Sequence, residues 1–194
     1  AVIPLSSIEY QYGFGVYETI RVTNGVSRFL SEHLERLAES ARIIGLEHLF
    51  STTTIYGSVE KLIEKNNVET CNLKILLIGG KTKEDASLYI LALSPLFPDK
   101  KLYRDGVHCI TYPYERVLPH AKTLNMLGSY LAYRKARMAD AYDALLLNRK
   151  GSITEGTRTN FFCIKDKTIM SPPEEEILLG VTRKYVLSVA RENG

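Results

Sequence analysis

Cysteine and histidine are both scarce in this chain of 194 residues, which has three cysteines and four histidines. Cys71, Cys109 and Cys163 lie far apart in apolar, strand-like stretches, without the spacing of a metal site. An odd number of separated cysteines indicates buried free thiols in a reducing compartment, which predicts a cytoplasmic protein. Because the histidines are scattered too, the sequence predicts no metal site.

A basic block and a long apolar run are also absent. The 25 basic and 22 acidic residues are interspersed and give a net charge of +3, so we expect no nucleic-acid partner. No apolar stretch approaches the roughly 20 residues of a membrane span, and the first residues do not predict a signal peptide. The composition, 45% hydrophobic and 24% charged, is that of a globular protein without membrane contact.

The first half of the chain predicts a small unit of strands and helices. Residues 15–22 alternate apolar and polar, as a half-buried strand does, and a hairpin turn signal, Asn24-Gly25, follows. The next apolar stripe has helical spacing and leaves His33, Arg36 and Ser40 together along one margin. The expected elements are a strand at 15–22, helices at 31–45 and 52–65, and strands at 72–78 and 87–93.

Two prolines between Ser94 and Lys101 interrupt this pattern and predict a linker at 96–101, between domains at 1–95 and 102–194. The expected elements of the second half are a strand at 106–112, a helix at 125–139, a β-meander at 143–170 and a helix at 182–193. Because the strands arrive largely as hairpins, the predicted fold class is α+β with two domains. No closing strand follows the last helix, so we expect a fragment whose C-terminal domain is incomplete.

Lys122 and Glu155 are candidate catalytic groups, although each also has an ordinary interpretation. Lys122 lies between a proline-bearing loop and an apolar helix, where desolvation would favour a Schiff-base amine. The alternative is an exposed lysine at a helix start. If Glu155 points inward, its carboxylate needs a cationic partner such as a pyridinium nitrogen. The alternative is an exposed turn residue.

An anion-binding feature is expected where Leu178-Leu-Gly180-Val-Thr182-Arg183 passes from a loop into a helix. Backbone N–H groups that open a helix, with a Thr hydroxyl beside them, form an anion seat, but Thr182 could equally be a plain N-cap. Arg36 could bind the same anion with two hydrogen bonds, or simply lie along a core helix. An amine, a carboxylate, an arginine and a helix N-terminus together are the parts of a pyridoxal-phosphate site.

Six segments, in this order along the chain, resemble the class IV (fold-type IV) pyridoxal-phosphate enzymes. This family includes branched-chain aminotransferases, D-amino-acid aminotransferases and 4-amino-4-deoxychorismate lyases. The resemblance extends from about Tyr12 to Arg191. Its segments are Tyr12–Arg21, His33-x-x-Arg36 with Ser40-Ala41, Lys122-Thr-Leu-Asn, Asp143–Asn148, Thr154-Glu155-Gly156 with Asn160-Phe161, and Leu178-x-Gly-Val-Thr-Arg183.

The resemblance implies an aminotransferase that uses pyridoxal 5'-phosphate to move an amino group between a small amino acid, of the branched-chain or D-amino-acid type, and a 2-oxo acid. It also implies a homodimer, with a small α/β N-terminal domain and a larger, pseudobarrel-type C-terminal domain. By this resemblance, Lys122 forms the Schiff base and transfers the proton, and Glu155 pairs with the pyridine nitrogen. Arg36, Val181 and Thr182 bind the phosphate. Leu178 packs on the cofactor ring, and Tyr17 lines the substrate pocket.

Some residues depart from the family pattern and leave the subgroup open. Leu127 stands where branched-chain enzymes often have Tyr, and Lys-x-Leu-Asn is more similar to the D-amino-acid and lyase forms. Lys74 resembles a lysine that faces the substrate carboxylates in lyases, although the arginines expected within 79–85 are missing. Arg158 is unusual and is either a substrate-binding addition or a surface charge. A pyruvate-releasing lyase is therefore the alternative, and a non-catalytic relative is a further one.

Overall fold

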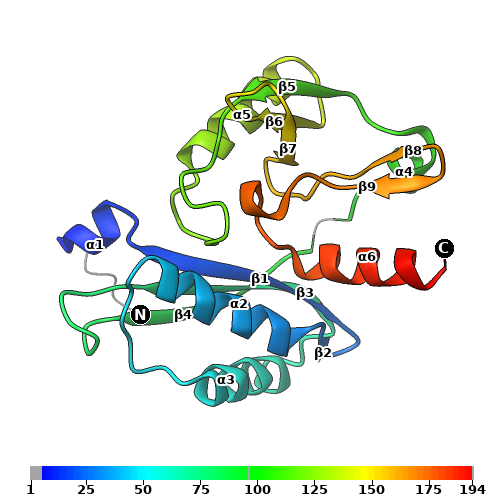
Figure 1. Ribbon diagram of the computed structural model, residues 1–194. Helices are drawn as coiled ribbons and strands as arrows, with labels where there is room; N and C mark the ends of the chain where they lie inside the picture. Colours follow the sequence, from blue (N-terminus) through cyan, green and yellow to red (C-terminus); the bar gives the residue numbers. More distant parts are fainter. Residues whose placement is uncertain (1–5, 96, 194) are drawn as a thin grey trace. The chain divides into compact units, whose positions relative to one another are not determined.

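The structure is a computed structural model that describes residues 6–95 and 97–193 (Figure 1). Packing divides the chain into two compact units, one formed by residues 1–96 with 121–125 and the other by residues 97–120 with 126–194. Both units combine helices and strands, which confirms the expected mixture of α and β structure. The domain boundaries proposed from the sequence stay a prediction.

The first unit is built on an antiparallel sheet with the strand order β2-β1-β3-β4. Its strands are β1 (Gly15–Thr23), β2 (Val26–Ser27), β3 (Thr70–Ile78) and β4 (Ser87–Leu93). Asn24 and Gly25, with φ of 53° and 71°, make the predicted turn between β1 and β2. Burial alternates along β1 and β3, so one face of the sheet is the core face.

Two helices, α2 (Leu30–Ile43) and α3 (Thr52–Lys65), pack against that core face (Figure 1). The predicted stripe on α2 is confirmed, because Leu30, Leu34, Leu37 and Ala41 are buried and Ile44 packs against them. Ser51 caps α3 by accepting the N–H of Thr54, which explains why the helix begins at Thr52. A single turn, α1 (Ile8–Gln11), precedes β1 and was not predicted.

The second unit contains a three-stranded sheet, β5-β6-β7, and a separate hairpin, β8-β9. Its elements are α4 (Lys100–Asp105), β5 (Cys109–Pro113), α5 (Leu127–Met138), β6 (Asp143–Leu147), β7 (Ile153–Gly156), β8 (Cys163–Lys165), β9 (Thr168–Met170), η1 (Glu174–Glu176) and α6 (Val181–Glu192). Alanines of α5 and β6 form its small core with Leu146.

One expectation for this unit was wrong. The predicted meander is interrupted after β7, where a single bridge between Glu155 and Asn160 replaces a continuous ladder and β8 and β9 form a separate sheet. β5 and β6 are parallel, whereas the pairs β6–β7 and β8–β9 are antiparallel, so the expectation that strands arrive largely as hairpins stands. Asp99 caps α4 by accepting the N–H of Lys101, so a short helix occupies part of the expected linker.

The three cysteines are free thiols, but their burial differs. Cys71 is buried and Cys109 is half-buried, whereas Cys163 is exposed. Burial was thus wrongly expected for Cys163, because every residue of the β8-β9 hairpin faces solvent. Within residues 6–95 and 97–193, no helix is both long and apolar enough to cross a membrane, and no cluster of metal-ligating side chains occurs.

Candidate functional site

Lys122 belongs to the first unit, where its backbone is fixed on both sides. Its N–H donates to the hydroxyl of Ser40 on α2 at 3.0 Å, and its carbonyl accepts the N–H of Tyr17 on β1 at 2.9 Å. Thr123 forms a bridge with Val16, so this segment runs antiparallel along β1. The lysine is therefore a strand-paired residue of a packed unit and not an exposed helix start.

The amines of Lys122 and Lys74 both lie near the ring of Tyr17. The distance from Nζ to the ring centroid is 4.7 Å for Lys122 and 5.2 Å for Lys74. Lys74 stands opposite Thr19 in the β1–β3 register, on the sheet face away from the core. Three residues singled out from the sequence thus lie together, and the face of an aromatic ring at this distance attracts an ammonium group.

Glu18 lies on the core face of β1 and holds Arg36. Arg36 donates from Nε to Oε1 at 2.6 Å and from Nη2 to Oε2 at 2.7 Å, and His33 Nδ1 lies 2.7 Å from Oε2. Burial raises the pKa of Glu18, but the hydrogen bonds with His33 and Arg36 outweigh it and hold the pKa below its ordinary value. Sequence reasoning found Arg36 but missed Glu18, although its alternation along β1 placed it on the core face.

Glu155 is buried in the second unit, which excludes the exposed-turn interpretation. Its side chain is 8% exposed and pairs with Arg116, whose Nη1 lies 3.3 Å from Oε1. The backbone N–H of Leu178 donates to Oε2 at 3.4 Å. Arg116 was missed because it is 39 residues away in the sequence, and only the fold brings the two charges together.

The segment after Leu178 leads into α6, which begins at Val181 with Gly180 in the N-cap position. Gly180 has no side chain with which to cap the first-turn N–H groups. Thr182 lies within the helix and is exposed, so its interpretation as an N-cap was wrong. A helix that begins in this way presents backbone donors suited to an anion.

Arg158 is exposed and stacks on α5. Its guanidinium carbon lies 4.8 Å from the ring centroid of Tyr133. This cation–π contact gives the side chain a partner within its own unit. Whether it also binds a substrate carboxylate stays a prediction.

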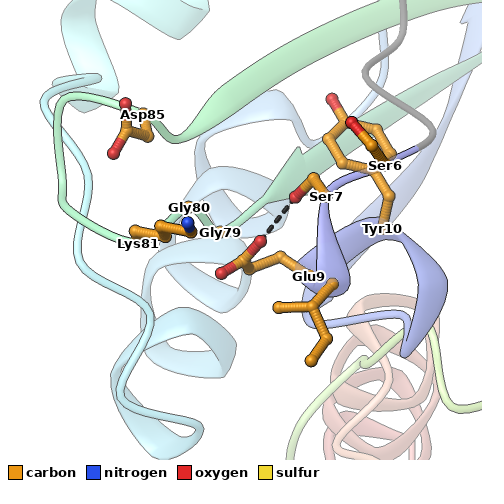
Figure 2. A pocket seen from close by; sticks show the side chains of 9 residues that line it. Ser6, Ser7, Glu9, Tyr10, Gly79, Gly80, Lys81 and Asp85 are labelled. Atoms are coloured by element: carbon orange, nitrogen blue, oxygen red, sulfur yellow. Dashed lines mark hydrogen bonds between the residues drawn. The ribbon is translucent and has the colours of Figure 1, made fainter.

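The first unit also contains an open pocket of about 680 Å³ (Figure 2). Figure 2 shows Ser7, Glu9 and Tyr10 on one side and Gly79, Lys81 and Asp85 on the other. None of the candidate residues from the sequence lines it. Its two carboxylates, Glu9 and Asp85, and one amine, that of Lys81, give it mixed charge.

Comparison with known proteins gives consistent matches over nearly the whole chain. A family model described as amino-transferase class IV matches residues 15–194. A D-alanine aminotransferase from Bacillus licheniformis is 35% identical over 195 residues, which cover 95% of this chain and 68% of the relative.

Solved structures match in fold as well. A branched-chain amino acid aminotransferase from T.th., solved with pyridoxamine 5'-phosphate, is 26% identical with a TM-score of 0.90, covering 100% of this chain and 70% of that one. A candidate 4-amino-4-deoxychorismate lyase from Legionella pneumophila is 26% identical with a TM-score of 0.89, covering 100% of this chain and 74% of that one.

Proposed function

This chain belongs to the class IV aminotransferase family, whose members depend on pyridoxal phosphate, and we propose that it transfers an amino group between a small amino acid and a 2-oxo acid. The similarity to D-alanine and branched-chain aminotransferases supports a donor of the D-amino-acid or branched-chain type. The observation that carries the proposal is the lysine of the family motif, Lys122, whose backbone is fixed and whose amine lies over Tyr17.

The residues present fit the cofactor chemically. An amine can bind an aldehyde, a buried carboxylate can accept from a protonated pyridine nitrogen, and an arginine with a helix N-terminus can bind a phosphate. Lys122, Glu155, Arg36 and the start of α6 provide these groups. When bound, pyridoxal phosphate supplies an electron sink that stabilises negative charge on the substrate α-carbon.

We propose that Lys122 Nζ would bind the aldehyde of pyridoxal phosphate and that the same amine would serve as the base for the proton on the substrate α-carbon. The hydrogen bonds that the Lys122 backbone makes with Ser40 and Tyr17 fix its Cα, so only the side-chain torsions remain to place the amine. Tyr17 would line the substrate pocket beside it. This limited freedom favours a proton transfer that needs a defined geometry.

Glu155 would accept a hydrogen bond from the pyridine N–H and keep that nitrogen protonated. Its carboxylate is desolvated, and Arg116 compensates the buried negative charge. The N–H of Leu178 binds the second oxygen, which fixes the carboxylate plane. Leu178 would also pack its side chain on the cofactor ring.

The phosphate would be bound by Arg36, the Val181 N–H and Thr182. Glu18 and His33 hold the guanidinium of Arg36 in place, so that it would meet the phosphate without first being ordered. The N–H groups of the first turn of α6 would add donors together with the partial positive charge of a helix N-terminus.

We propose further that residues 1–95 and 102–194 are two domains joined by a linker at 96–101, the second one of pseudobarrel type. The division of the chain into two compact units near residue 96 supports this boundary, while residues 121–125 of the second sequence region pack within the first unit. We also propose a homodimer in the cytoplasm. Three free thiols suit a reducing compartment, and the homodimer follows from the family resemblance.

A lyase that releases pyruvate from 4-amino-4-deoxychorismate is the second candidate, because the amine of Lys74, the residue that resembles a carboxylate-facing lysine of lyases, lies near the same Tyr17 ring as that of Lys122. A product assay separates the two activities. An aminotransferase converts a panel of D- and branched-chain amino acids with 2-oxo acids into new amino acids, and Lys122→Ala abolishes this. Release of p-aminobenzoate and pyruvate from aminodeoxychorismate, without amino transfer, would establish the lyase instead.

A further inference from the structure

Both main-chain polar groups of Leu178 are bound by side chains from one neighbouring segment. The N–H of Leu178 donates to Glu155 Oε2 at 3.4 Å, and its carbonyl accepts from Asn160 Nδ2 at 2.8 Å. Glu155 and Asn160 are themselves joined by an antiparallel bridge between their backbones. Each of these three residues therefore contacts the other two, so that a shift of one of them changes the contacts of both others.

The same asparagine also abuts the residue that begins α6. A Cβ atom at Gly180 would lie 2.0 Å from Asn160 Oδ1 and 3.2 Å from Asn160 Cγ. The φ and ψ of Gly180, −69° and 136°, are accessible to any residue. A side chain at Gly180 would therefore displace the Asn160 amide, although the backbone conformation itself would accept one.

We propose that Asn160 is a positioning residue that fixes the Leu178–Gly180 segment. It thereby keeps the carboxylate of Glu155 at a fixed distance from the N-terminus of α6. The inference rests on the proposed function, because these two groups are the ones assigned to the pyridine nitrogen and the phosphate. A small cofactor that is bound at both ends tolerates little error in the spacing of the groups that bind it. Asn160 itself does not contact the reacting atoms.

Asn160→Asp tests this role because it keeps the shape of the side chain and replaces the donor by an ionised acceptor that faces the Leu178 carbonyl. We expect the Kd for pyridoxal phosphate to rise about tenfold or more, as for the loss of a buried hydrogen bond with its acceptor left unpaired. We also expect the absorbance maximum of the bound cofactor to shift, because the carboxylate near the pyridine nitrogen moves. Both are measured by spectroscopic titration of the full chain.

Asn66→Asp is the matched control. Asn66 makes the same kind of bond, from Nδ2 to the carbonyl of Leu62 at 2.8 Å, on the exposed end of α3 in the other unit. We expect it to leave the Kd and the absorbance maximum unchanged. The thermal midpoint of each cofactor-free variant is measured in parallel, since a purely structural role would lower the midpoint without shifting the absorbance of the cofactor that still binds.

A second pair of variants tests the contact with Gly180. Gly180→Ala should weaken cofactor binding in the wild-type chain, and should weaken it much less in the Asn160→Ala background, where the clashing amide is gone. Equal losses in both backgrounds would overturn the proposal, and so would a wild-type Kd and spectrum for Asn160→Asp. If the wild-type chain itself bound no pyridoxal phosphate, the proposed function would fail first, which is a different result.

Discussion

Arg36 holds both carboxylate oxygens of Glu18, through Nε to Oε1 at 2.6 Å and through Nη2 to Oε2 at 2.7 Å. The Glu18 side chain is fully buried and that of Arg36 is 13% exposed. This two-point geometry fixes the plane of the guanidinium, which a single hydrogen bond would not do. The pair joins β1 to α2, and Ser40 of the same helix accepts the N–H of Lys122.

Glu18→Gln is expected to lower the free energy of unfolding by about 3–5 kcal/mol, because it leaves the arginine charge without its buried partner. Urea denaturation of the full chain measures this. Glu39→Gln is the matched control on the same helix, since Glu39 makes an exposed two-point pair with Arg42. We expect a change within about 0.5 kcal/mol there. Equal losses of unfolding free energy for the two variants would show that the buried pair stabilises the fold no more than the exposed pair does.

The stability that Glu18 contributes should depend on pH. The pKa of Glu18 in the folded protein is below its ordinary value of 4.5, so folding favours the ionised form. Its contribution is therefore complete above the ordinary pKa and is lost as pH falls through the lower folded pKa. We expect the difference in unfolding free energy between wild type and Glu18→Gln to shrink as the pH is lowered below 4.5. A difference that stays constant under acidic conditions would contradict the ionised pair.

Periodicity in the sequence was enough to place the two long helices and the three long strands of the first unit, but not α1. The apolar stripe from Leu30 to Ile44 and the alternation along β1 are local patterns, and the structure follows them closely. Local patterns did not predict α4, because its six residues span less than two turns and show no apolar period. They also could not show that β5 and β6 are parallel, since strand direction depends on the path of the intervening chain.

In the candidate site, too, the sequence predicted local features but not contacts between distant residues. Lys122 and Glu155 were found because their motifs are local, whereas their partners are distant in the sequence. Ser40 and Lys122 are 82 residues apart, and Arg116 and Glu155 are 39 residues apart. No spacing rule connects such pairs, so only the folded chain identifies them.

Glu155→Gln should retain the cofactor but lower kcat about 10- to 100-fold. A neutral amide gives up a hydrogen bond to a charged group worth about 1.5–3 kcal/mol, and each 1.36 kcal/mol is tenfold in rate. Glu175→Gln is the control, because Glu175 is exposed in η1 within the same unit. Steady-state kinetics with saturating pyridoxal phosphate measure the change. An unaltered kcat in Glu155→Gln would show that Glu155 is not the residue that keeps the pyridine nitrogen protonated.

Lys74→Met should distinguish substrates by their charge. If the ammonium of Lys74 binds a second carboxylate, KM for a dicarboxylic 2-oxo acid should rise about tenfold, as for the loss of a charge-assisted hydrogen bond. KM for a monocarboxylic 2-oxo acid should change little. Lys61→Met, at an exposed position of α3, is the control. Equal changes for both substrates would assign Lys74 to the support of Tyr17 instead.

The central claim is that Lys122 is the amine that binds pyridoxal phosphate, and reductive trapping tests it most directly. The full chain is incubated with the cofactor, reduced with borohydride, digested and analysed by mass spectrometry. Lys74 is a competitor within the same protein, because its amine lies near the same tyrosine ring. We predict a phosphopyridoxyl group on Lys122 in the wild type and none in Lys122→Ala. Modification of Lys74, or of no specific lysine in the wild-type chain, would contradict the account.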